Sequence, residues 1–210
     1  MTFLEKFCEC GVNFNYIEIC DISKIDSRWS SGLKVIDFDQ ISEKVCKGKY
    51  SSLKSCDALR ISKAKNCMDF IELKKIEELI NMAKSSKECV KRVKNFNLYG
   101  KIFDSVVIIR NMISNGQFKF TRDEINEFYY IPKNFIVAID TQEPRESFHN
   151  TMTLLAVVPN SPVNQIIDNL RNIAINGIND QLKEIEENGV IRLNSVKLMT
   201  FSKIYEYYTK

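Results

Sequence analysis

The sequence contains little of what breaks, cross-links or anchors a chain. Its 210 residues include one histidine, one tryptophan, four prolines and seven glycines. This scarcity of glycine and proline excludes collagen-like and low-complexity chains. The longest apolar stretches, such as 135–139 and 154–158, are far too short to cross a membrane. With 44% hydrophobic and 27% charged residues, the chain is expected to fold as a single domain over residues 1–210.

A strong net charge is also missing, and the cysteines follow no regular pattern. Thirty Lys and Arg residues against 27 Asp and Glu give a formal net charge of +3, which is weak grounds for naming a partner. The seven cysteines are odd in number and irregularly spaced, which argues against a disulfide framework. Residues 1–10 carry charges among their apolar residues and lack a signal-peptide core. We therefore expect a cytoplasmic protein with free thiols and no membrane contact.

Hydrophobic periodicity predicts strands and helices in a mixed order. The stretch 134–139 is almost continuously apolar, which is typical of a strand buried on both faces. The stretch 98–113 places apolar residues at helical spacing, and its expected buried face contains Ile102, Val106, Ile109 and Ile113. This order predicts an α/β fold with a mixed sheet flanked by helices. The expected strands are 14–20, 35–38, 55–61, 67–74, 134–139, 152–158 and 190–201, and the expected helices are 3–7, 39–46, 75–93, 98–113, 162–187 and 204–208.

The segments 55–61 and 67–74 form the most informative pair, because they read as one hairpin. A turn centred between Ala64 and Lys65 would place Asp57 opposite Glu72. Side chains alternate along a strand, so both carboxylates would share a face with Lys74. Directly opposed residues have Cβ atoms roughly 4.5–5.5 Å apart. The hairpin therefore predicts two converging carboxylates with an ammonium group two residues beyond, provided that the register does not slip.

Two facing carboxylates repel each other unless a cation lies between them. A hard divalent ion held by oxygen ligands, Mg²⁺ or Mn²⁺, removes this repulsion. Such an ion lowers the pKa of a bound water and stabilises charge on a phosphate oxygen. Lys74 could then orient or deprotonate the water, or stabilise charge in the transition state. These are the requirements of phosphodiester hydrolysis.

An Asp on one strand followed by Glu-x-Lys on the next resembles the signature of PD-(D/E)XK nucleases, a family that includes restriction endonucleases. The resemblance covers about residues 39–110 and implies a restriction-endonuclease-like fold. Asp57, Glu72 and Lys74 would be catalytic, with Asp57 and Glu72 as ligands of Mg²⁺ or Mn²⁺. In this family an earlier helix often adds an acid, which matches Glu43, and a later helix sometimes adds a polar or basic residue, which matches Lys101. Cys56 stands where the family motif has proline.

The resemblance implies a nuclease acting on DNA, with RNA as an alternative substrate, in a restriction or phage-defence system. A partner subunit or a homo-oligomer would then select the target. A different reading is a non-catalytic protein of the same fold that binds or regulates a protein partner. At the level of single residues, the hairpin charges could form a surface salt bridge, Lys101 could pair with Asp104, and the tyrosines at 205, 207 and 208 could pack or stack on bases.

Overall fold

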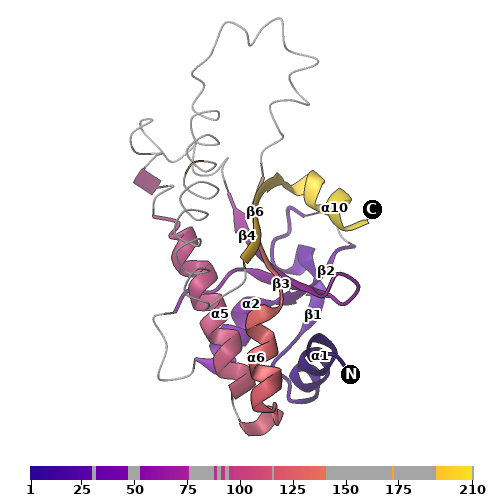
Figure 1. Cartoon of the computed structure of the whole chain (residues 1–210). Coiled ribbons are helices and arrows are strands. Elements are labelled where there is room, and N and C mark those ends of the chain that lie inside the picture. Colours follow the sequence, from indigo (N-terminus) through magenta and orange to yellow (C-terminus); the bar gives the residue numbers. More distant parts are fainter. Residues whose placement is uncertain are drawn as a thin grey trace, which may run out of the picture.

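The computed structural model describes residues 1–29, 32–46, 53–75, 88, 91–92, 95–114, 116–140, 172 and 193–209. Within these ranges the chain forms a six-stranded sheet with helices on both faces (Figure 1). The predicted α/β fold, a mixed sheet flanked by helices, is confirmed. No helix in the described part of the chain is long and apolar enough to cross a membrane. The strand predicted at 152–158, almost all of the helix at 162–187 and most of the helix at 75–93 lie outside the described residues.

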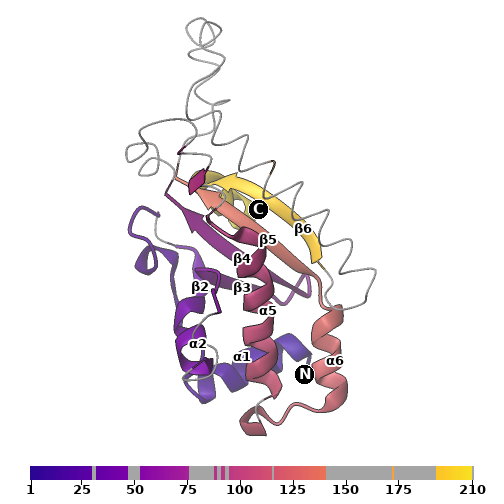
Figure 2. The ribbon, with the colours of Figure 1, turned by 90° about the vertical axis from the view of Figure 1, so that its left-hand side faces the viewer.

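The six strands lie in chain order across the sheet. The first four pair antiparallel, whereas the fifth and sixth run parallel to the fourth. The fifth strand is buried along its whole length, as its continuous apolar sequence predicted. In Figure 2 the strands run diagonally across the view, and most of the helices lie below them. They are β1 (Ile19–Asp21), β2 (Lys34–Asp37), β3 (Ala58–Ser62), β4 (Cys67–Lys74), β5 (Lys133–Ile139) and β6 (Leu193–Thr200).

Four helices share the larger hydrophobic core with one face of the sheet: α1 (Phe3–Asn13), α2 (Phe38–Val45), α5 (Leu98–Ser114) and α6 (Arg122–Tyr130). The buried stripe predicted for α5 is confirmed, since its four residues are at most 3% exposed. The sequence reading missed α6, although a capping box between Thr121 and Glu124 marks where it begins. At the other end of α6, the fully buried Lys133 donates hydrogen bonds from Nζ to the carbonyl oxygens of Phe128 (2.5 Å) and Ile131 (2.8 Å).

The opposite face of the sheet is covered by a smaller core. Ile71 and Ile136 of the sheet pack there with Ile204 of the C-terminal helix α10 (Phe201–Thr209). The Trp29 ring stacks on Phe201 with ring centroids 3.9 Å apart. Two short 3₁₀-helices, η1 (Ile22–Lys24) and η2 (Gly116–Phe118), complete the described elements. The aromatic helix expected near the end of the chain is therefore present.

Two local predictions were wrong in position. The expected strand at 14–20 is reduced to β1, because the chain turns back on α1: Asn15 has φ 57° and the Ile17 amide donates to the Gly11 carbonyl at 3.0 Å. A side chain at Gly11 would collide with Ile17, at 2.1 Å from its Cδ1 atom. The helix predicted at 39–46 begins one residue earlier, as α2 at Phe38, because its N-cap is Asp37, whose carboxylate accepts a hydrogen bond from the Gln40 amide at 3.2 Å. The six cysteines in the described residues are free thiols.

Candidate active site

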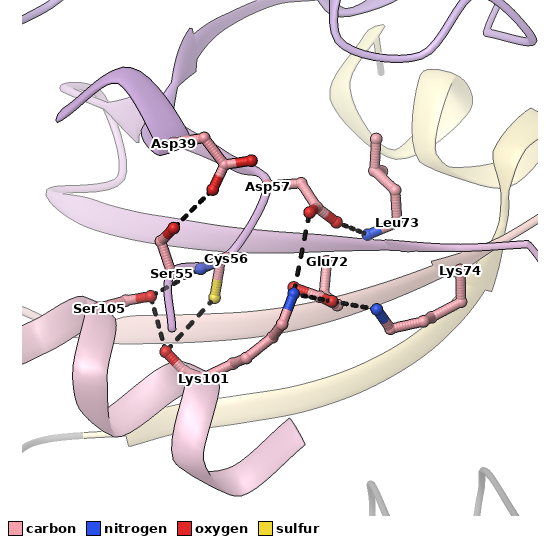
Figure 3. Close-up of polar contacts among 9 residues, drawn as sticks. All are labelled: Asp39, Ser55, Cys56, Asp57, Glu72, Leu73, Lys74, Lys101 and Ser105. Carbon is pink, nitrogen blue, oxygen red and sulfur yellow. Dashed lines mark hydrogen bonds and ion pairs between the residues drawn. The ribbon is translucent and has the colours of Figure 1, made fainter. Parts of the chain in front are cut away.

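The β3–β4 hairpin has the register that the sequence predicted. Leu59 pairs with Phe70 and Ile61 with Met68, so Asp57, one residue before β3, reaches the level of Glu72. The Asp57 Oδ2 atom accepts a hydrogen bond from the Leu73 amide at 2.5 Å, and Figure 3 shows its carboxylate directed toward the end of β4. The two carboxylates therefore belong to one polar cluster at the open end of the hairpin.

Glu72 lies at the centre of this cluster and its side chain is completely buried. Its Oε1 atom accepts hydrogen bonds from the ammonium groups of both Lys74 and Lys101. Its Oε2 atom is buried and has no hydrogen-bond partner among the described residues. Burial raises the pKa of Glu72, and the charge of Asp57 adds to this effect, while the two lysines oppose it. A buried carboxylate with one free oxygen can accept a further cation or donor at low cost in rearrangement.

Lys101 joins the site from the first turn of α5. Its Nζ atom lies 2.5 Å from Glu72 Oε1 and 3.9 Å from Asp57 Oδ1, and its side chain is 18% exposed. Burial lowers the pKa of Lys101, but Glu72 and Asp57 outweigh that effect and the pKa is raised. The alternative pairing of Lys101 with Asp104 does not form; Asp104 instead accepts from the Lys54 amide at 2.9 Å. Lys101 is thus held as an ammonium ion beside both carboxylates.

Lys74 approaches Glu72 from the same strand. Its side chain is 13% exposed and its Nζ atom lies 4.8 Å from the centroid of the Phe96 ring. An ammonium group over an aromatic face is favoured by the ring quadrupole. The site therefore contains two carboxylates and two ammonium groups, and little of it reaches water.

Buried hydrogen bonds fix α5 against the strand that enters the site. The Ser105 hydroxyl accepts from the Cys56 amide at 2.9 Å and donates to the Lys101 carbonyl at 2.7 Å. Ser105 and Cys56 are both fully buried. Because Ser105 lies about one helical turn after Lys101, these bonds set the distance between the Lys101 side chain and Glu72 (Figure 3).

The acid that α2 brings nearest to the cluster is Asp39 rather than Glu43. The Asp39 carboxylate accepts a hydrogen bond from the Ser55 hydroxyl at 2.5 Å. Ser55 lies two residues before Asp57 in the chain. Although Asp39 is exposed as a whole residue, desolvation of its carboxyl and the charge of Asp57 raise its pKa, against the Ser55 hydrogen bond. Glu43 lies one turn further along α2 and is exposed. Its predicted role as a metal ligand stays a prediction, and the geometry favours Asp39 for any acidic contribution from this helix.

The donor set fits a magnesium-type ion but does not form a closed cage. In the described part of the chain, no group of three or more His, Cys, Asp or Glu residues is arranged to hold a metal. Mg²⁺ is commonly held by only one or two carboxylates and keeps several waters. Asp57 and Glu72 supply that number, and Glu72 Oε2 supplies an unused buried oxygen. Soft metals are disfavoured, because Cys56, the nearest thiol, is buried and the pKa of its sulfur is raised well above its usual range by burial.

The structure thus brings together Asp57, Glu72, Lys74 and Lys101 and leaves Glu43 at the surface. Sequence reasoning missed Asp39, Ser55 and Ser105. Only Asp39 had a usable signal, since it is an acid on the helix where one was expected. Comparison with protein-family models, with curated proteins and with solved structures found no match to this chain.

Proposed function

We propose that this protein is a metal-dependent nuclease that hydrolyses phosphodiester bonds in DNA. The proposal rests on the Glu72 carboxylate, completely buried beside Asp57, with one oxygen on two ammonium groups and the other without a partner among the described residues. Burying a charged group is costly unless it is paired and hydrogen-bonded, so the oxygen without a described partner is the position where a cation would be favoured. A cluster of this composition suits a reaction in which a divalent ion and positive side chains meet a phosphate.

Asp57 and Glu72 would hold Mg²⁺ or Mn²⁺, which supplies an activated water and charge stabilisation at the phosphate. The chain's own contribution is electrostatic. Lys74 and Lys101 place two ammonium groups beside the carboxylates before substrate arrives, so no reorganisation is needed when negative charge develops. Ser105 positions Lys101, and the Leu73 amide fixes one oxygen of Asp57. RNA is an alternative substrate, since nothing in this cluster distinguishes the two sugars.

A second function is supported by the same ion pairs. Both lysines already neutralise Glu72 without any metal, so the cluster could serve to hold α5 on the sheet in a protein that binds or regulates a protein partner.

In the nuclease proposal, by contrast, a partner subunit or homo-oligomer selects the target. Action in the cytoplasm, within a restriction or phage-defence system, belongs to the nuclease proposal and rests on the family resemblance.

The test is cleavage of plasmid and single-stranded DNA with Mn²⁺, Mg²⁺ or EDTA. Wild type, Glu72→Gln and Lys74→Met are compared with Glu127→Gln and Lys34→Met, which make the same changes at exposed positions away from the cluster. The proposal expects metal-dependent cleavage that is lost in the first two variants and kept in the two controls. Absence of cleavage with either metal favours the non-catalytic function. Cleavage that survives Glu72→Gln refutes this site.

A further inference from the structure

A positively charged surface lies next to α10, on the face of the sheet opposite Glu72. It consists of Arg60 on β3, Lys65 in the β3–β4 turn and Lys197 on β6, gathered around Tyr207 and Tyr208 of α10. We call it the tyrosine–cation surface. Successive residues of a strand point to opposite faces, and Asp69 and Ile71 of β4 face this side, as the contact with α10 shows.

Each cation of this surface is held by an aromatic ring. The Arg60 guanidinium carbon lies 3.9 Å from the Tyr208 ring centroid. The Nζ atoms of Lys197 and Lys65 lie 4.2 Å and 5.3 Å from the Tyr207 ring centroid. Lys197 also donates a hydrogen bond to the Tyr207 hydroxyl at 3.0 Å. The two rings are 5.0 Å apart at 66°, so the three cations are grouped around one aromatic pair.

Carboxylates do not neutralise this group in the described structure. Among the described residues, none of the three cations forms an ion pair with an Asp or Glu side chain. Asp69, an acid on this face, is 2% exposed and accepts hydrogen bonds from the Tyr208 hydroxyl at 2.9 Å and the Asn134 amide at 2.6 Å. The bond from Tyr208 also fixes α10, and with it the tyrosines, on the sheet. The surface is therefore built rigidly and keeps an excess of positive charge.

We propose that the tyrosine–cation surface binds the phosphodiester backbone of a nucleic-acid strand outside the catalytic cluster. Phosphates complement uncompensated Lys and Arg charges, and tyrosines among such cations are typical of surfaces that bind single strands. The choice of nucleic acid over an acidic protein rests on the proposed function, because a nuclease of nearly neutral net charge needs a local basic surface to hold its substrate. This surface would hold a strand on the face opposite the cut.

The test measures binding without cleavage, so that it is independent of the catalytic proposal. A fluorescein-labelled 20-nucleotide thymidine strand is titrated with protein in EDTA, and anisotropy is followed at several salt concentrations. The double variant Lys65→Met/Lys197→Met is compared with Lys24→Met/Lys34→Met, which removes two charges from exposed lysines elsewhere. Thermal melts establish that both variants are folded, and Lys65→Met alone, in the exposed turn, serves if the Lys197 change impairs folding.

Each phosphate contact with a single strand contributes about 0.7 to the slope of log K against log salt. The proposal therefore expects the slope to fall by about 1.4 in Lys65→Met/Lys197→Met and binding at 0.1 M salt to weaken roughly 25-fold. The Lys24→Met/Lys34→Met control should bind as wild type does. An equal loss in both double variants, or no loss in either, overturns the proposal. If poly-glutamate binds as tightly as the thymidine strand, and Lys65→Met/Lys197→Met weakens both equally, the choice of nucleic acid over an acidic protein is overturned. If wild type does not cleave DNA but its strand binding is lost only in Lys65→Met/Lys197→Met, the proposed nuclease activity fails and this surface is still supported.

Discussion

Replacing Lys101 by methionine should destabilise the metal-free protein more than the same replacement at an exposed lysine does. The Lys101 ammonium is 2.5 Å from a carboxylate oxygen of the completely buried Glu72. Breaking a fully buried pair costs about 3–5 kcal/mol, whereas a hydrogen bond to a charged group contributes about 1.5–3 kcal/mol. Because Lys101 is 18% exposed and Lys74 remains on the same oxygen, the lower figure applies. We expect the free energy of unfolding to fall by about 2 kcal/mol.

For a chain of this length, a loss of about 2 kcal/mol lowers Tm by about 4–8 °C. Denaturant and thermal unfolding in EDTA measure it, with Lys34→Met as control, because Lys34 is 69% exposed and lies 3.9 Å from Asp21. The control should lose less than about 1 kcal/mol. In a Glu72→Gln background, Lys101→Met should leave the free energy of unfolding almost unchanged. The two substitutions should therefore be coupled by about 1.5–2 kcal/mol. If Lys101→Met is as mild as Lys34→Met, or costs the same in both backgrounds, the reasoning about the buried cluster is wrong.

Three further predictions follow from the described residues. At free Mn²⁺ ten times its Kd, the free energy of unfolding should rise by about 1.4 kcal/mol, which is about 3–6 °C in Tm; a thermal melt of Glu72→Gln should show no such rise. Burial lowers the pKa of Lys133 to about 7, so above that pH the folded state binds fewer protons than the unfolded state, and stability should increase from pH 7 to 8 by up to about 1.4 kcal/mol. Urea unfolding at both pH values would show this increase in wild type and not in Lys133→Met. Tyr208→Phe removes a donor from the buried Asp69 and should cost about 1–3 kcal/mol in denaturant unfolding, whereas Tyr205→Phe at an exposed position should change stability by less than about 0.5 kcal/mol.

Local patterns predicted the part of the fold that depends on neighbours in sequence. The register of the hairpin could be predicted because a short polar turn fixes which residues of its two strands face each other. A slip by one residue would turn Phe70 away from the core. The buried stripe of α5 followed from helical spacing in the same way. The helix α6 was missed because its sequence is largely polar and only Phe128 is buried on it, so the hydrophobic signal was weak.

The rest of the candidate site depends on packing between distant segments. Lys101 lies 29 positions after Glu72, and only the docking of α5 through Ser105 and Cys56 brings its ammonium to the carboxylate. Periodicity assigns Lys101 to a helix face but does not determine where that helix begins relative to the hairpin. Asp39 and Glu43 are four apart on α2 and share a helix face, and their order relative to Asp57 depends on how α2 sits on the sheet. The hydrogen bond from the Tyr208 hydroxyl to Asp69 joins β4 to the C-terminal helix and had no local signal.

Crystals grown with Mn²⁺ would show whether Asp57 and Glu72 hold a divalent cation, as we propose. Anomalous difference maps locate the ion without relying on activity. We expect one strong peak per chain, roughly 2 Å from Glu72 Oε2 and from an oxygen of Asp57, which is absent in crystals of Glu72→Gln. A map with no peak between these carboxylates, with Lys74 and Lys101 still paired to Glu72 at saturating Mn²⁺, would contradict the claim and identify the cluster as a structural ion network.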